Sequence, residues 1–195
     1  MSILALTSDT LIGTPATGNI EYNGQFYGTD SNASRAQMQR IVRATAVAST
    51  SGTSIDFTGI PAWVERITVM FSGTSLSGTA NALVQLGTGS TTYTTSGYSA
   101  NSAVVEAAGN TVVSSTAGFI VYFGANASVV SGHLIITNIS GNNWISSHNA
   151  RIDTAKPSLG AGSIALGAVL TAIRITSTNG TDTFDAGSIN IMYEG

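Results

Sequence analysis

The chain of 195 residues contains no cysteine, only three prolines and two histidines, and charged residues make up just 9% of it. Without cysteine there can be no disulfide, no thiolate nucleophile and no cysteine-ligated metal. Soluble proteins ordinarily carry ~25% charged residues. A content this low excludes a charged helical bundle or coiled coil, which needs many Glu, Lys and Arg side chains.

Long apolar runs and basic clusters of the targeting kind are also missing. No stretch of ~18 apolar residues occurs, so no membrane-spanning helix and no membrane insertion are expected. The first eleven residues contain neither lysine nor arginine and include Asp9, so we expect no secretory signal. A formal net charge of −3 argues against nucleic acid as the main ligand.

Small polar residues dominate what is present. Serine, threonine and glycine together account for 73 of the 195 residues, while hydrophobic residues account for 43%. That hydrophobic fraction is sufficient for a core, because a chain of this size buries about two-thirds of its unfolded surface. A polar but uncharged composition is typical of secreted or permanently assembled β-proteins rather than of metabolic enzymes.

The segment 52–195 has the pattern of an all-β domain. In the run 66–72, Ile67, Val69 and Phe71 alternate with other residues and therefore share one face of a strand. Short runs of this kind, separated by Gly- and Asn-rich turns, predict an antiparallel two-sheet sandwich that is jelly-roll-like. The predicted strands lie at 66–72, 83–87, 119–123, 132–137, 143–148, 172–176 and 187–193.

The segment 1–51 is predicted to be an N-terminal arm and hairpin. Its opening is apolar, with Ile3, Leu4 and Leu6, and is followed by turn residues up to Gly18. This opening is either an assembly segment that docks on a neighbouring molecule or a frayed terminus.

Two local elements are expected within this N-terminal segment. In 20–27, Asn23-Gly24 lies between Tyr22 and Phe26, which predicts a β-hairpin with a type I′ turn. Farther on, the potential N-cap residues 31–34 precede a stretch that could form a short helix over 33–43.

Candidate catalytic residues are scarce, and we expect no enzyme, no cofactor and no metal site. The two histidines, His133 and His148, are accompanied by no Gly-x-Ser-x-Gly motif between a strand and a helix. Asp182 and Asp185 could be paired carboxylates of a glycosidase. The favoured interpretation is structural: Asp182 belongs to the turn at 179–182, and Asp185 caps the loop. Two histidines without cysteine do not give a zinc-ligand spacing.

The basic residues cluster at Arg35, Arg40 and Arg43. They belong either to a solvated or salt-bridged segment or to pairs between subunits, with Asp30 or Asp56 of a neighbouring chain as partner.

Four aromatic residues could contact a sugar or a protein partner. Trp63 and Trp144 could stack on sugar rings or fill the core. The segment 88–98 combines Tyr93 and Tyr98 with Ser, Thr and Gly, a composition found in recognition loops and also in ordinary hairpins. We take Tyr93, Tyr98 and Trp144 as the candidates for glycan or partner contact.

Three runs resemble elements of tailed-bacteriophage virion proteins. The run 55–71, Ile-Asp-Phe-Thr-Gly-Ile-Pro followed by a strand of the form Arg-Ile-Thr-Val-Met-Phe, is the most specific. The run 183–194 resembles the closing strand of the same proteins, and 18–27 is similar to a Glu-Tyr-Asn-Gly element of phage tail and fibre proteins.

The resemblance implies a virion structural protein that is a homotrimer, assembles in the host cytoplasm and contacts other virion proteins. We expect a tail fibre or appendage component whose N-terminal segment anchors it and whose sandwich attaches to a host-surface glycan. The alternative is a capsid decoration or cement protein. A glycan-degrading enzyme is a third reading, and its mark would be two carboxylates or a Ser–His contact facing one pocket. The candidate assembly residues are Ile3, Leu4, Leu6, Tyr22, Phe26 and Arg35.

Overall fold

The computed structural model describes residues 10–195 except positions 12, 15, 24, 108, 127 and 155. The chain divides into two compact units, 1–40 and 41–195. The sequence predicts the boundary at 51/52. The observed boundary lies earlier, after residue 40, because residues 41–48 pair with the last strand of the second unit. No helix in the described part of the chain is long and apolar enough to cross a membrane.

The N-terminal unit contains the predicted hairpin, extended by a third strand into an antiparallel sheet. Its strands are β1 (Ile20–Tyr22), β2 (Phe26–Thr29) and β3 (Arg35–Gln37). Tyr22 and Phe26 are direct partners across the hairpin, with ring centroids 5.0 Å apart. Gly24 of the predicted turn lies outside the described residues.

The predicted helix over 33–43 is wrong. The side chain of Asp30 accepts hydrogen bonds from the backbone N–H groups of Asn32 and Ser34, both at 2.9 Å, and Ala33 has a φ of 57°. The polar residues that suggested a helix cap therefore form a tight turn that returns the chain into β3.

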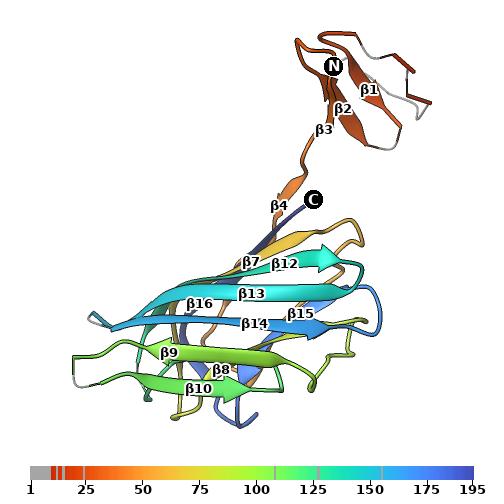
Figure 1. Cartoon of the computed structure of the whole chain (residues 1–195). Coiled ribbons are helices and arrows are strands. Elements are labelled where there is room, and N and C mark those ends of the chain that lie inside the picture. The colour runs from red at the N-terminus through yellow and green to blue at the C-terminus, as the bar shows by residue number, and fades with distance from the viewer. Residues whose placement is uncertain are drawn as a thin grey trace, which may run out of the picture. The chain divides into compact units, whose positions relative to one another are not determined.

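The second unit is an antiparallel sandwich of two sheets, as predicted. In the broad sheet, β10, β9, β14, β13 and β12 follow one another side by side (Figure 1), and β7, β16 and β4 continue the order. The smaller sheet has the order β11-β8-β15-β6. The strands are β4 (Ile41–Arg43), β5 (Val47–Ala48), β6 (Ser54–Thr58), β7 (Arg66–Leu76), β8 (Ala82–Gly87), β9 (Ser99–Val104), β10 (Thr111–Ser115), β11 (Phe119–Val121), β12 (Val130–Ser140), β13 (Asn143–Ile152), β14 (Lys156–Ala165), β15 (Ala172–Ser177) and β16 (Phe184–Glu194).

Strands from opposite ends of the chain pair with one another. β7 pairs with β16, β8 with β15 and β9 with β14, so the chain is folded back on itself as a long antiparallel ribbon. The runs 55–71 and 183–194 meet through the first of these pairs, where Arg66 lies opposite Glu194 and forms an ion pair with it at 2.9 Å.

Alternating side chains from both sheets fill the core. Along β13, buried and exposed residues alternate: Trp144, Ser146, His148, Ala150 and Ile152 are buried, and each residue between two of them is exposed. In the smaller sheet, Ile173 and Ile175 of β15 are fully buried. The two sheets enclose one continuous hydrophobic core, which fixes the loops and the outer faces in position.

Candidate functional site

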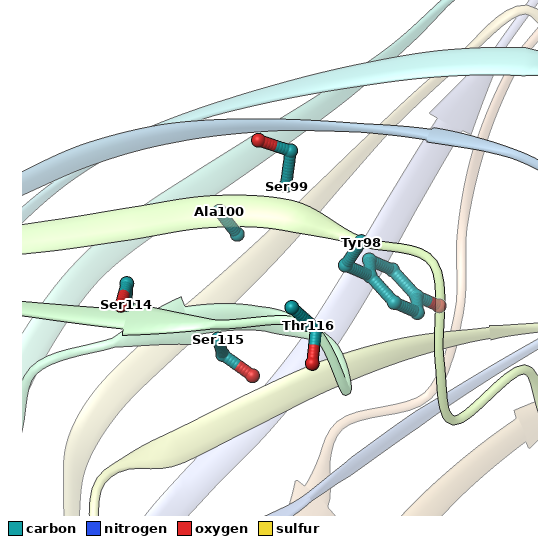
Figure 2. A pocket seen from close by; sticks show the side chains of 6 residues that line it. All are labelled: Tyr98, Ser99, Ala100, Ser114, Ser115 and Thr116. Atoms are coloured by element: carbon teal, nitrogen blue, oxygen red, sulfur yellow. The ribbon is translucent and has the colours of Figure 1, made fainter.

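Three hollows on the sandwich include polar lining residues. The first, of about 380 Å³, is lined by residues of β9 and β10 and the positions next to them (Figure 2): Tyr98, Ser99, Ala100, Ser114, Ser115 and Thr116. It offers hydroxyl groups but no charged side chain. The second, of about 390 Å³, is lined by Trp144 and by Ile139, Ile145 and Ile164, among others.

Tyr98 and Trp144 are core residues, which corrects the prediction that they contact a glycan. Their side chains are only 2% and 4% exposed. The hydroxyl oxygen of Tyr98 accepts a hydrogen bond from the N–H of Leu86 at 2.7 Å, and burial raises its pKa to about 12. The Nε1 of Trp144 is buried without a hydrogen-bond partner among the described residues. Neither ring presents a face on which a sugar could stack.

The third hollow, of about 400 Å³, lies on the outer face of the smaller sheet. Arg174 of β15 lies directly opposite Asp56 of β6 on one side and Gln85 of β8 on the other. The neighbouring row pairs Thr176 with Leu83. Arg174, Gln85, Thr176 and Leu83 form the floor, and Asp56 lies next to it. The start of β6, a residue shortly before β11 and the end of β15 with its following turn complete the lining: Thr53, Ser54, Ala117, Ser177, Thr178, Asn179 and Gly180.

The guanidinium of Arg174 is held in place by two neighbours. Its Nε and Nη2 donate to the two carboxylate oxygens of Asp56 at 2.8 and 2.7 Å, a bidentate pair. The ring of Tyr93 lies 4.2 Å from the guanidinium carbon, a cation–π contact. Of the three aromatic residues predicted for glycan contact, Tyr93 alone remains at the surface beside a hollow.

Gln85 supplies a fixed polar group to the same hollow. Its side chain is 7% exposed, and its Nε2 donates to the carbonyl of Ala117 at 2.9 Å. Its Oε1 has no hydrogen-bond partner in the described part of the chain. Sequence reasoning missed Gln85 and Arg174, because only their register on neighbouring strands brings them together.

A second carboxylate lies next to the hollow. Asp182 accepts hydrogen bonds from the side-chain amide of Asn179 at 2.8 Å and from the N–H of Ala80 at 3.0 Å. These two bonds, the first more than the second, hold the pKa of Asp182 below its usual value, so the group stays ionised. As the sequence suggested, Asp182 belongs to the 179–182 turn, where Asn179 accepts from the backbone N–H groups of Thr181 and Asp182.

A Ser–His contact exists but is enclosed in the core. Nε2 of His148 lies 3.0 Å from Oγ of Ser102 and 3.4 Å from Oγ of Ser158. All three side chains are buried, and none of them lines any of the three hollows. No group of three His, Asp or Glu side chains among the described residues could hold a metal ion.

The N-terminal sheet has one polar and one apolar face. Partners in the register share a face, so Ile20 lies with Gly28 and Ala36 in one row and Tyr22 with Phe26 in the next. Met38 lies on the same face, because its Cε is 3.6 Å from the position that a Cβ atom on Gly28 would occupy.

This apolar face is open. Ile20, Phe26 and Met38 are 67%, 42% and 45% exposed. The opposite face carries the ion pair between Arg35 and Glu21, at 2.7 Å. Arg35 therefore pairs within its own chain, and Asp56 pairs with Arg174. Of the predicted assembly residues, Tyr22 and Phe26 share the apolar face, and Ile3, Leu4 and Leu6 lie outside the described residues.

Comparison of the chain with models of known protein families, with curated proteins and with solved structures finds no match.

Proposed function

We propose that this chain is a structural protein of a bacteriophage virion, a tail fibre or appendage component that assembles as a homotrimer and attaches to a host-surface glycan. The resemblance of runs 18–27, 55–71 and 183–194 to phage virion proteins supports the virion setting. The observation that carries the assembly is the open apolar face of the N-terminal sheet, formed by Ile20, Tyr22, Phe26 and Met38.

The N-terminal unit is too small to bury its own apolar surface. Its described residues lie within 10–40, and units of about this size usually need disulfides, metals or oligomerisation. The chain has no cysteine, and the described residues hold no metal-ligand cluster. Other copies of the same face supply the missing burial, and the ion pair between Arg35 and Glu21 on the opposite face stays within its own chain.

Assembly makes attachment through the sandwich multivalent. Each copy brings one sandwich, so three copies present three identical sets of surface hollows. Weak sites that engage together bind far more tightly than one alone, because the second and third contacts form at a high effective concentration. A virion component can therefore hold a host surface without any single strong contact.

Two polar substitutions on the apolar face are expected to separate the copies. In the double variant Phe26→Ser, Met38→Ser, association loses most of the apolar area that drives it. Light scattering is expected to give three times the 19.8 kDa chain mass for the wild type and the single-chain mass for the variant. Val112→Ser, an exposed valine on the sandwich, is the matched control and keeps the wild-type mass. A single-chain mass for the wild type contradicts the proposed assembly.

The location in the particle is tested by antibody labelling of virions. The proposal predicts label on the tail at a few to a few dozen copies. Label spread over the head in hundreds of copies supports the capsid decoration alternative instead. Purified virions that carry no label contradict both.

A further inference from the structure

We infer that the hollow over Arg174 and Gln85 binds a neutral, hydroxyl-rich ligand, a neutral sugar unit, in preference to an anionic one. This inference rests on the proposed attachment function, which brings a glycan to the protein. The ligand class itself follows from the hydrogen-bonding groups and charges that line the hollow.

The fixed groups at the hollow offer one donor edge and one acceptor. Asp56 engages Nε and Nη2 of Arg174 and leaves Nη1 without a partner among the described residues. Ala117 engages the amide nitrogen of Gln85 and leaves its Oε1 to accept. A hydroxyl group both donates and accepts, so two adjacent sugar hydroxyls can satisfy Oε1 and Nη1 together.

These groups are already in position before a ligand arrives. Arg174 is held on one side by its bidentate pair with Asp56 and by the ring of Tyr93. Gln85 is almost completely buried, and its hydrogen bond to the carbonyl of Ala117 fixes the orientation of its amide. Little side-chain freedom is left to lose on binding, which favours the weak, repeated contacts that a multivalent assembly uses.

The local charge disfavours an anionic ligand. Arg174 is the one charged residue among those that line the hollow. Asp56 pairs with its guanidinium, and Asp182 lies beside the hollow, where it accepts a hydrogen bond from the lining residue Asn179. The bidentate pair already neutralises that guanidinium. A uronic or sialic acid would place a further negative charge next to two carboxylates, which raises its free energy of binding. The remaining lining of Ser, Thr and Asn side chains is uncharged.

The experiment measures binding of the intact protein to immobilised oligosaccharides, with neutral members and matched members in which one sugar is a uronic acid. The wild type is expected to bind at least one neutral member and to discriminate against its uronate counterpart. Gln85→Met keeps the volume but removes the acceptor, and is expected to weaken neutral binding about tenfold. Gln37→Met, on an exposed strand of the other unit, is the matched control and leaves binding unchanged.

Asp56→Asn tests the charge argument directly. It retains the shape of the side chain but frees the positive charge of Arg174, so the preference is expected to shift toward the uronate by about tenfold. Asp153→Asn, at an exposed Asp elsewhere on the sandwich, is the control and leaves the preference unchanged. Thermal unfolding of each variant establishes that it is folded.

Three results overturn the inference: binding of no neutral oligosaccharide by the wild type, a wild-type preference for the uronates, or unchanged neutral binding by folded Gln85→Met. The two proposals fail separately. If virions carry the label and uronate members bind but neutral members do not, the ligand inference alone is wrong. If neutral sugars bind through the hollow but virions carry no label, the proposed virion function is wrong.

Discussion

Replacement of Phe119 by alanine is expected to lower the free energy of unfolding of the sandwich by about 3–5 kcal/mol. Phe119 begins β11 and is one of the largest fully buried side chains. Its ring meets the ring of Tyr98 edge-on, with centroids 5.1 Å apart. The substitution removes that contact and leaves a cavity that rigid strands on both sides cannot close.

The loss is measured by urea unfolding followed through tryptophan fluorescence, since Trp144 lies in the same core. Protein concentration is held fixed, because association changes the apparent stability. Ile145→Ala, on the exposed face of β13, is the control and is expected to cost less than about 1 kcal/mol. A loss below about 1.5 kcal/mol for Phe119→Ala would show that the region between the sheets is not packed as described.

Strands with large alternating side chains could be predicted from the sequence, and strands built from small residues could not. β7 carries Ile67, Val69 and Phe71 at every second position, and β16 carries Ile189, Ile191 and Tyr193 in the same way, a signal that is local. β9 and β14 consist largely of Ser, Ala and Gly, which resemble a loop in isolation. Their strand character comes from pairing with neighbours, which no local pattern records.

Gly160 illustrates why small residues are required in β14. It lies opposite His148 on one neighbouring strand and opposite Ser102 on the other. A Cβ at this position would lie 2.2 Å from the carbonyl oxygen of Asn101 and 2.4 Å from Cε1 of His148. The glycine that weakened the strand signal thus makes room for the imidazole.

The candidate site was predictable only in part. Tyr93 lies at the surface, but the same Tyr-Ser-Thr composition around Tyr98 surrounds a buried ring, because composition does not distinguish the two faces of a strand. Arg174, Asp56 and Gln85 lie far apart in the sequence and meet only through the order β6-β15-β8. The N-terminal apolar face was foreseen at Tyr22 and Phe26, whereas Met38 fell within a stretch expected to be helical.

The buried histidine makes the sandwich sensitive to acid. Burial lowers the pKa of His148 from 6.5 to about 4 in the folded protein. Its Nε2 contacts the hydroxyls of Ser102 and Ser158, and the oxygen of Ser102 also accepts from the N–H of Tyr122. No carboxylate is hydrogen-bonded to the imidazole among the described residues, so nothing compensates a positive charge there.

Stability is therefore expected to fall as the pH drops from about 6.5 to 4. In this window the unfolded chain binds a proton at His148 and the folded chain does not, so protonation favours unfolding; above 6.5 the contribution is fully present. The shift corresponds to about 3 kcal/mol. Urea unfolding at several pH values measures it, and His148→Gln is expected to remove this part of the slope, because glutamine does not titrate. His133→Gln, on the exposed side of β12, is the matched control. It retains His148 and every carboxylate that titrates in the same pH range. An identical slope in His148→Gln and the wild type would show that the imidazole is protonated in the folded protein as readily as in the unfolded chain.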